Sequence, residues 1–378
     1  MKILLLGYSV RGLAELAAHS SCPSQLLALD NFADLDLGRW ARVINRQPDL
    51  GKTAFDAVAY VSGLESCPEL LEELAQDKIV LGNSPQTLRQ LQDTKKMIKL
   101  LEDNQIYFPQ VLYPGQIIPH RGKWLLKEQA RSGGVGVSWA KAGLKVPEGF
   151  IGQQFLSGRP ASVSFVADGQ NFILLGLNEQ LCGVKELDDK NFLYRGNLFP
   201  LELPAYRSEV ILQVRKMVAV VTKAYRLKGL NGLDFLFLSD GKIAFLELNP
   251  RYCASMELYW HGLGIDLFKL HLESCLGKLA LDDFPLAFPT DKYWGKAIVY
   301  APESVKTGDT SFWFDLGIRD IPQPGQRIGK GEPVCTVFSS GSSRSTCLRE
   351  LKRKQEYVLG LLDPFGAKPV VRSYDYDN

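Results

Sequence analysis

The sequence predicts an α/β and α+β protein of three units: a Rossmann-like domain over residues 1–84, a two-lobed α+β domain over 85–290, and a small β-rich unit over 291–378. Three observations lead to this prediction. Apolar runs alternate with helical patterns in the first unit, which is typical of a doubly wound parallel sheet. The second unit combines hairpins with long helical patterns. In the third unit glycine and proline are frequent and the apolar runs are short.

The overall composition is that of an ordinary globular protein. The 378 residues are 46% hydrophobic and 23% charged, with a net charge of +2, which gives no reason to expect nucleic acid or an anionic membrane as a partner. The first apolar run breaks at Gly7, too early for a signal peptide, and no stretch approaches the roughly 20 apolar residues of a membrane span. Seven cysteines without CxxC spacing and four scattered histidines argue against disulfides, zinc and haem. We therefore expect a cytoplasmic protein with reduced thiols.

The first unit contains four buried strands and a helix. The strands are predicted from the apolar runs at 2–7, 25–30, 55–63 and 78–84, and the helix from the spacing at 10–20. Gly7 and Gly12 flank the first strand-to-helix turn, and Asp30 ends the second strand. The pattern lacks the middle glycine of a dinucleotide-binding turn, so close helix packing is the favoured interpretation and a ligand site at this edge is the alternative.

The second unit begins with an amphipathic helix over residues 85–106. Strands at 124–128 and 137–142 enclose the glycine-rich loop at 131–136, as in a hairpin whose tip can close over a ligand. A long helix with one apolar stripe is predicted at 208–227, and a shorter one at 267–277. The third unit ends in an amphipathic helix over 345–362.

The most informative segment is the hairpin at residues 230–251, where two apolar strands are joined by a Ser-Asp-Gly turn. The turn makes Asp234 and Glu247 neighbours, and the two-residue period of a strand puts Glu247, Asn249 and Arg251 on one face. Two carboxylates in an apolar sheet repel each other, and a divalent cation removes that repulsion. Oxygen ligands favour Mg²⁺ or Mn²⁺. The alternative is a buried ionic cluster with Arg251 or a lysine.

A site for Mg²⁺ and phosphate also needs cations and backbone N–H donors. Lys95, Lys127 and the loop at 132–136 can supply them, because glycines let the backbone approach phosphates closely. The segment at 151–158 can bind a flat base through its backbone, with Gln154 adding an amide. Taken singly, each feature has a simpler explanation: a solvated lysine, a flexible hairpin tip or an ordinary edge strand.

The order of these features resembles the ATP-grasp superfamily over residues 1–277, most specifically in LDF and LELNPR of the hairpin. The resemblance implies a pre-ATP-grasp domain at 1–84 and an ATP-grasp domain at 85–290, of which 85–160 is mainly the lid lobe. It implies ATP and Mg²⁺ (or Mn²⁺) as cofactors. The implied site residues are Arg251 and Lys127 for catalysis; Lys95, Lys127, Ser132, Gly133, Gly134, Gly136, Gln153, Gln154 and Leu156 for ATP; and Asp234, Glu247 and Asn249 for the metal.

Two further features qualify the resemblance. Many ATP-grasp proteins place an acid just after the hinge glycine to hold the ribose, whereas this sequence has Gly158 and Arg159 followed by PAS, and Arg159 is a poor substitute. The C-terminal third looks like a subgroup of ATP-grasp ligases from one-carbon coenzyme biosynthesis, such as the tyramine–glutamate ligase of methanofuran synthesis. The segment GQRIGKGEPV also resembles a biotinyl-domain hammerhead, but no Met-Lys-Met biotin site is present.

These observations favour an ATP-dependent ligase that joins a carboxylate, for which the resemblance suggests glutamate, to an amine through an acyl phosphate. Two alternatives stay open: a carboxylase-like enzyme that uses bicarbonate, and a nucleotide-binding protein without turnover. Substrate specificity is expected between the N-terminal domain and Arg251, where Arg11, Asp30 and Glu257 are candidates alongside plain packing roles. The partners are small molecules, and a homodimer is permitted by the apolar helices.

Overall fold

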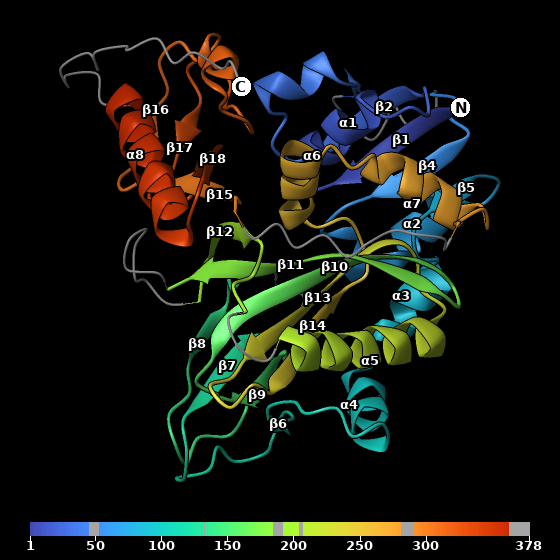
Figure 1. Ribbon diagram of the computed structural model, residues 1–378, viewed down its shortest axis with the longest axis vertical. Helices are drawn as coiled ribbons and strands as arrows, with labels where there is room; N and C mark the ends of the chain where they lie inside the picture. Colours follow the sequence, from blue (N-terminus) through green and yellow to red (C-terminus); the bar gives the residue numbers. More distant parts are fainter. Residues whose placement is uncertain are drawn as a thin grey trace.

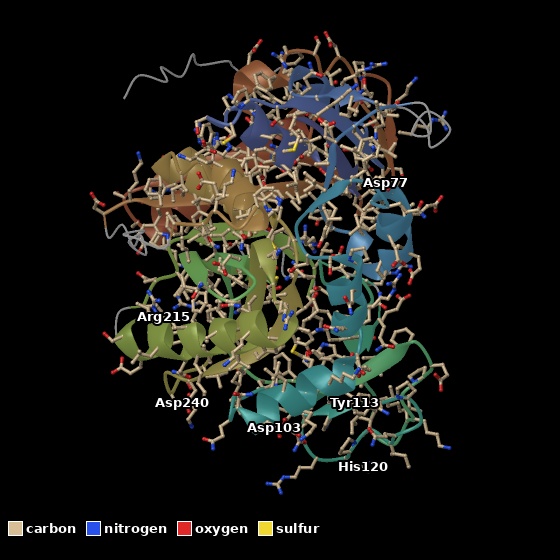
Figure 2. All side chains as sticks on the ribbon, turned by 90° about the vertical axis from the view of Figure 1, so that its right-hand side faces the viewer. Asp77, Asp103, Tyr113, His120, Arg215 and Asp240 are labelled. Atoms are coloured by element: carbon tan, nitrogen blue, oxygen red, sulfur yellow. The ribbon has the colours of Figure 1, made fainter. Side chains whose placement is uncertain are left out.

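The computed structural model describes residues 1–44, 53–129, 131, 133–183, 192–203, 207–280 and 291–362. Figure 1 shows the N-terminal domain and the C-terminal unit at one end of the molecule, with the central sheet below them and the small sheet of the lid lobe at the other end. Figure 2 shows the same arrangement from the side: Asp77 lies at the N-terminal end, whereas Tyr113 and His120 lie at the lid-lobe end.

The N-terminal domain is a parallel sheet with the order β3-β2-β1-β4-β5 within the described residues. Continuous apolar runs form its strands because both faces are covered. All four strands and the helix predicted from the sequence are confirmed. The bounds are β1 Lys2–Gly7, α1 Arg11–Ala18, β2 Gln25–Asp30, η1 Leu35–Arg39, β3 Arg42–Val43, β4 Ala57–Tyr60, η3 Leu64–Ser66, α2 Pro68–Leu74 and β5 Ile79–Leu81.

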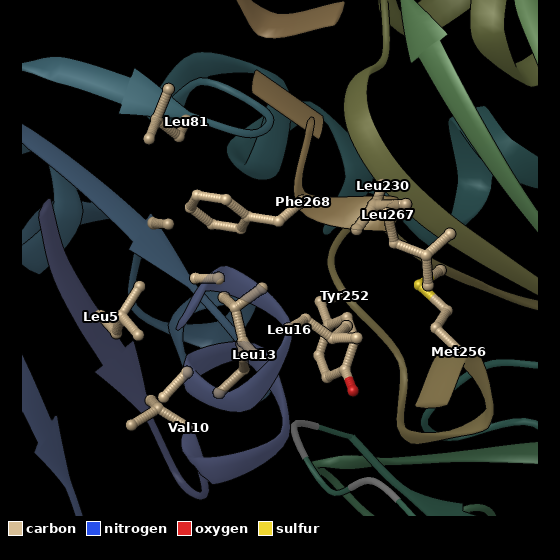
Figure 3. Close-up of a cluster of buried hydrophobic side chains, with 14 of the residues drawn as sticks. Leu5, Val10, Leu13, Leu16, Leu81, Leu230, Tyr252, Met256, Leu267 and Phe268 are labelled. Carbon is tan, nitrogen blue, oxygen red and sulfur yellow. The ribbon is translucent and has the colours of Figure 1, made fainter. Parts of the chain in front are cut away.

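One face of this sheet shares a hydrophobic core with helices from the second unit. In Figure 3, Phe268 of α7 lies among Leu5, Leu13 and Leu81 of the N-terminal domain. Phe268 and Leu5 are fully buried. The bounds of the second-unit helices on this face are η4 Ala254–Met256, α6 Glu257–Leu263 and α7 Leu267–Cys275. This common core holds the N-terminal domain against the segment that follows the acidic hairpin.

The helix predicted over residues 85–106 is two helices, so the single-helix prediction was wrong. The first is α3 Pro85–Leu91, whose N-cap Ser84 accepts a hydrogen bond from the Thr87 backbone N–H. The second is α4 Thr94–Asp103, capped in the same way by Asp93. The Asp93 side chain satisfies a free N–H at a new helix start, and this competes with continuing the first helix.

The lid lobe contains an antiparallel sheet with the order β6-β9-β7-β8 in the part of the chain that is described. Its bounds are β6 Val111–Leu112, β7 Trp124–Glu128, β8 Val137–Trp139 and β9 Phe150–Gln154. The predicted hairpin around the glycine-rich loop is therefore confirmed, with a shorter second strand than expected.

The central sheet has the order β14-β13-β10-β11-β12-β15-β18 across the described segments. The strands up to β14 are β10 Arg159–Asp168, β11 Phe172–Cys182, β12 Tyr194–Phe199, β13 Lys228–Phe237 and β14 Ile243–Asn249. Helix α5 Arg207–Tyr225 covers one face, because Val210, Val214, Val218 and Val221 recur every three or four residues and are fully buried. The acidic hairpin β13–β14 forms one edge of this sheet.

The C-terminal unit is β-rich, and its two longest strands extend the central sheet. Strands β15 Tyr293–Tyr300 and β18 Pro333–Gly341 pair with each other, and β15 also pairs with β12. Helix α8 Arg344–Leu362 packs on this pair. The remaining elements are β16 Val305–Lys306, η5 Trp313–Leu316 and β17 Arg327–Ile328. The sequence did not indicate this continuity, since strand pairing between distant segments leaves no local pattern.

All seven cysteines lie in the described residues and are free thiols, as predicted. None of the described helices is long and apolar enough to cross a membrane.

Candidate active site

The β13–β14 hairpin places its two acidic residues side by side. Asp234 and Glu247 are opposite each other in the antiparallel register, and a register shift beside them leaves Leu246 as the extra residue of a β-bulge. The side-chain amide of Asn249 donates a hydrogen bond of 3.2 Å to Asp234 Oδ2. The hairpin therefore brings together the three residues that the sequence predicts as metal ligands.

The two carboxylates carry negative charge that is only partly balanced. Asp234 is partly buried and Glu247 is exposed. Burial, followed by the nearby charge of Glu247, raises the pKa of Asp234 to about 7, although Gln180, Arg251 and Asn249 act against this shift. A divalent cation between these oxygens would remove the repulsion. The donor set thus fits Mg²⁺.

Arg251 is held in place by the N-terminal domain. Its Nε lies 2.7 Å from Glu65 Oε1, and its Nη2 donates to Asn249 Oδ1 at 3.1 Å. Burial lowers the pKa of Arg251, but the carboxylate of Glu65 and neighbouring groups raise it further, so the guanidinium stays charged. Sequence reasoning missed Glu65, because it lies 186 positions from Arg251 in an unremarkable short helix.

A cavity of about 360 Å³ lies beside this edge of the sheet, where all three units meet. Its wall includes Asp234, Asn249 and Arg251 from the hairpin, Gly133 from the glycine-rich loop, and residues of the N-terminal domain and C-terminal unit. The N-terminal domain contributes Ser9, Arg11, Gly12, Phe32, Asp34, Val61 and Ser62. The C-terminal unit contributes Lys296, Ile298, Tyr300, Asp320 and Pro333 to Thr336. The volume is at the lower end of the range of about 300–1,000 Å³ for small-molecule sites.

The two predicted phosphate-binding lysines lie in the lid lobe, away from the lining of this cavity. Lys95, on α4, is exposed, and its Nζ lies 5.3 Å from the ring centroid of Tyr113. Lys127, on β7, is partly buried and pairs with Val137 and Ile151 in the lid sheet. No described contact joins either lysine to the acidic hairpin, so their roles toward ATP stay predictions.

The glycine-rich loop contacts the segment after the lid lobe and reaches the cavity. Gly133, Gly134 and Gly136 have φ values of +67°, +78° and +75°, which only glycine adopts readily. The Gly133 carbonyl accepts a hydrogen bond of 2.9 Å from the Tyr194 backbone N–H. A Cβ at Gly134 would lie 1.8 Å from the Phe192 carbonyl oxygen. Ser132, predicted to belong to the phosphate loop, lies outside the described residues.

The segment predicted to be the adenine hinge connects β9 of the lid sheet to β10 of the central sheet. Gln153 is buried in β9 between β6 and β7, and Gln154 ends that strand. Leu156 lies beyond the strand and is partly buried. Arg159 is engaged elsewhere, with its guanidinium 5.4 Å from the ring centroid of Phe237, so nothing indicates that it replaces the missing ribose acid.

Three units meet in a network of buried charges around Arg11, which is 1% exposed. Arg11 lies 2.7 Å from Glu15 and 2.5 Å from Glu257 of α6, and its Nε lies 2.8 Å from Asp320 of the C-terminal unit. Lys296 of β15 pairs with Glu257 from the other side. Sequence reasoning missed Lys296, although a lysine within the apolar run of a strand is itself a signal of a buried partner.

The turn before α1 is explained by packing, the favoured interpretation of its sequence. A Cβ at Gly12 would lie 2.8 Å from the Tyr252 hydroxyl oxygen, so a larger residue would push α1 away from the second unit. Asp30 accepts hydrogen bonds from the backbone N–H groups of Val10 and Ala33. These two bonds fix the turn instead of leaving the carboxylate free for a ligand.

Residues 91–255 match the family model of the ATP-grasp domain. This match covers 165 of the 378 residues. Its sequence is 28% identical over 214 residues to an uncharacterized protein of Methanocaldococcus jannaschii, which covers 54% of this chain and 48% of that protein. It is 24% identical over 247 residues to the carbamoyl phosphate synthase large chain of Caldanaerobacter subterraneus, covering 58% of this chain and 22% of the relative. The chain therefore spans about half and about a fifth of these two proteins.

Solved structures show that the ATP-grasp fold extends over nearly the whole chain. The L-amino acid ligase of Bacillus licheniformis superposes with a TM-score of 0.71 and 14% identity, covering 94% of this chain and 96% of that one. The biotin carboxylase domain of Hydrogenobacter thermophilus 2-oxoglutarate carboxylase was solved with MgADP and bicarbonate. It superposes with a TM-score of 0.70 and 12% identity, covering 96% of this chain and 93% of that one. At such identities the likeness establishes the fold, and it confirms the predicted fold class.

The biotin carboxylase of Campylobacter jejuni was solved as a complex with β,γ-ATP and the Hydrogenobacter thermophilus domain with MgADP, so proteins of this fold bind the expected cofactors, ATP and Mg²⁺. The acidic hairpin lies within the matched range, since Asp234, Glu247 and Asn249 all fall between residues 91 and 255. All the cavity-wall residues of the N-terminal and C-terminal units lie outside that range. The family match thus covers the predicted metal ligands and the part of the cavity wall that the hairpin contributes.

Proposed function

We propose that this protein is an ATP-dependent ligase that joins a carboxylate to an amine through an acyl phosphate. The ATP-grasp domain supports the use of ATP, and its neighbours include an L-amino acid ligase. Glutamate as the carboxylate and a role in one-carbon coenzyme biosynthesis come from the sequence resemblance. A cytoplasmic location comes from the composition and the cysteine usage, and a homodimer is permitted by the apolar helices.

The observation that carries the proposal is the cavity that continues from the acidic hairpin into the junction of the three units. About 360 Å³ is more room than bicarbonate needs, since a water molecule has a share of about 30 Å³. Asn249 and Arg251 line the cavity at the hairpin, and Phe32 lines it from the N-terminal domain. A carboxylate and an amine can therefore meet beside the residues that are expected to hold the phosphates.

The proposed reaction has two displacement steps. A carboxylate oxygen of the substrate attacks the γ-phosphorus, the bond to the β-phosphate oxygen breaks, and ADP leaves. The amine nitrogen then attacks the acyl carbon, phosphate leaves, and a proton is lost as the amide forms. Mg²⁺ held by Asp234, Glu247 and Asn249 would neutralise phosphate charge.

Side chains of this protein orient and stabilise the transferred group. Arg251, fixed by Glu65, faces the cavity and can stabilise the charge on the phosphoryl group and then on the leaving phosphate. Lys95 and Lys127 are proposed to contact the ATP phosphates, and the backbone N–H groups at Gly133, Gly134 and Gly136 to cover them. No side chain needs to act as a nucleophile, so positioning and exclusion of water supply the catalysis.

The test is Mg²⁺-dependent ADP release with L-glutamate and a pool of amines, added separately and together. The ligase proposal predicts ADP only when both are present, and a loss of about 10²–10³-fold in Glu247→Gln. Glu356→Gln, an exposed glutamate on α8, is the matched control and should keep wild-type activity. ATP binding without ADP release in every mixture would instead support a non-catalytic nucleotide-binding protein.

A second candidate is a carboxylase-like enzyme that uses bicarbonate. It is favoured by the similarity to carbamoyl phosphate synthase and by the biotin carboxylase fold of several neighbours. The same assay separates the two, because bicarbonate alone should then release ADP while amines have no effect.

A further inference from the structure

Among the described residues of the cavity wall, Asp34 is an acidic residue with one unpartnered side-chain oxygen. Asp34 lies between β2 and η1, lines the cavity, and is 9% exposed. Its Oδ2 atom is buried and has no hydrogen-bond partner. A buried carboxylate oxygen without a partner is rare, because the lost hydration is costly. It therefore indicates a group that is supplied from outside the chain.

The neighbouring carboxylates are already engaged, which singles out Asp34. Asp36 accepts hydrogen bonds from the backbone N–H groups of Asp320 and Ile321, at 3.2 and 2.9 Å. Asp320 accepts two hydrogen bonds from Arg11. These contacts, like the backbone bonds of Asp30 described above, tie the junction together. Within the described residues, Asp34 is the member of this acidic group that lines the cavity and has a buried carboxylate oxygen without a hydrogen-bond partner.

The charges around Asp34 would favour a positive ligand. Burial, followed by the charges of Asp320, Asp36 and Asp30, raises the pKa of Asp34 to about 9, and Arg11 opposes this only in part. Arg11 itself is surrounded by Glu15, Glu257 and Asp320, so little of its charge is left for Asp34. A cationic ligand would stabilise the carboxylate form and balance the local excess of acids.

An ammonium group fits this position better than a metal ion. A divalent cation takes several oxygen ligands, whereas the oxygens of Asp30, Asp36 and Asp320 already accept N–H groups. An ammonium needs only a few acceptors and can also lie against an aromatic ring. Phe32, two residues before Asp34 and 44% exposed, lines the same cavity.

We propose that Asp34 is the residue that recognises the amine substrate, and that this substrate is a primary amine carrying a protonated amino group, bound at Asp34 beside the ring of Phe32. The proposal rests on the ligase function and names its acceptor class. The cavity connects this position to the hairpin end, where Asn249 and Arg251 lie. The unpartnered carboxylate oxygen indicates the chemical class of the ligand. The rest of the cavity wall would select the carbon skeleton of the amine.

The test compares binding of amines with binding of their uncharged analogues to the full-length protein near neutral pH. The pairs are n-butylamine and 1-butanol, phenethylamine and 2-phenylethanol, and putrescine and 1,4-butanediol, titrated by calorimetry. At least one amine should bind about tenfold more tightly than its alcohol, as one charge-assisted hydrogen bond predicts. Equal binding within all three pairs, or no binding of any amine, would overturn the proposal.

Variants then locate the preference. Asp34→Asn should bind amine and alcohol about equally, and Asp34→Glu should keep the preference for the amine. Asp77→Asn, an exposed aspartate at the side of the N-terminal domain (Figure 2), should behave like wild type. Because the side-chain Oδ2 of Asp34 has no hydrogen-bond partner and the backbone bond that its carbonyl accepts from Leu37 is kept in the variant, Asp34→Asn should not lower Tm. An amine preference that persists in Asp34→Asn, or a lower Tm in that variant, would contradict the proposal.

This experiment needs no turnover, so the two proposals can fail separately. Amine preference without ADP release would count against the ligase function alone. Glutamate- and amine-dependent ADP release without amine preference would count against the role of Asp34 alone.

Discussion

Two clusters of charge face the same cavity and differ in how they are balanced. At the junction of the three units, Arg11 and Lys296 are enclosed by carboxylates from separate parts of the chain. At the edge of the central sheet, Asp234 and Glu247 are opposite each other, and the amides of Asn249 and Gln180 with the guanidinium of Arg251 offset their charge only in part. The first cluster is completed by the chain itself, whereas the second needs a ligand.

This difference separates residues that hold the three units together from residues that are proposed to bind ligands. Buried ion pairs whose partners come from different units fix the arrangement of those units, and breaking one leaves a buried charge uncompensated. Carboxylates without a partner at a cavity destabilise the folded protein, and a bound cation offsets that destabilisation. Asp34 lies within reach of the junction cluster but belongs to the second class, since its Oδ2 has no partner.

The largest expected effect is on stability and comes from the junction. Arg11→Met should lower the free energy of unfolding by about 3–5 kcal/mol, because Glu15, Glu257 and Asp320 lose their common partner in a buried site. Urea denaturation measures this. Arg89→Met, which removes an exposed arginine from Glu72, should leave the free energy close to wild type. Similar small losses in both variants would show that the junction is not structural.

At the sheet edge, we expect a substitution to lower activity without lowering stability. Asp234→Asn should lower the rate of Mg²⁺-dependent ADP release by about 10²–10³-fold, because one of the proposed metal ligands is lost. In the absence of metal its Tm should be unchanged or higher, because the repulsion with Glu247 is removed. Differential scanning fluorimetry with and without Mg²⁺ checks both signs. A lower Tm without metal would mean that Asp234 acts as part of the framework.

Asp34 gives a test based on pH. Its pKa is raised to about 9 in the folded protein, whereas an unfolded aspartate titrates near 4, so the folded state binds the proton more tightly. The contribution of Asp34 to the free energy of unfolding is therefore fully present at low pH and is lost as the pH rises toward 9. Between about pH 5 and 8 the free energy of unfolding of the wild type should fall relative to Asp34→Asn by up to about 1.4 kcal/mol per pH unit. Parallel pH profiles of the two proteins would disprove this assignment.

The neighbours of Asp34 do not reverse that comparison. The pKa of Asp36 is raised to about 6, which adds a decline of the same sign below that pH, and the pKa of Asp320 is lowered to about 2, which affects only acidic conditions. Both groups are present in the wild type and in the variant. The difference between the two profiles therefore isolates Asp34.

The smallest expected effect concerns Glu65, which links the two clusters by holding Arg251. Glu65→Gln should lower kcat about tenfold and change the KM for ATP little, because the guanidinium keeps its charge but loses its fixed orientation. Steady-state kinetics of ADP release gives both constants. Glu69→Gln, an exposed residue on α2, is the control. A change in the KM for ATP alone would place Glu65 in nucleotide binding.

Local patterns predicted much of this structure. Apolar runs located β1, β2, β4 and β5, and the Ser-Asp-Gly turn set the pairing of β13 with β14 closely enough to bring Asp234 opposite Glu247. A hairpin is a short-range structure, so its register follows from the turn and the side-chain alternation. The bulge at Leu246 was not visible, because it depends on how the strand meets its surroundings.

Contacts between distant segments were beyond such patterns. Arg11 meets Asp320 across 309 positions, and Arg251 meets Glu65 across 186. The sequence identified Arg11 and Glu257 as candidates without showing that they pair with each other. Asp34 was not predicted at all, since its importance lies in the absence of a partner, and that can be recognised only once the neighbouring carboxylates and their partners are placed.

The pairing of β12 with β15 has a consequence for how the chain can be shortened. If the protein ended before β15, the hydrogen-bonding groups of β12 would form an open strand edge beside an apolar surface, and such edges pair with other molecules. A truncated ATP-grasp domain made from the family-matched range alone should therefore self-associate and precipitate. We expect the C-terminal strands to act as a covering that keeps this edge of the central sheet from pairing with other molecules.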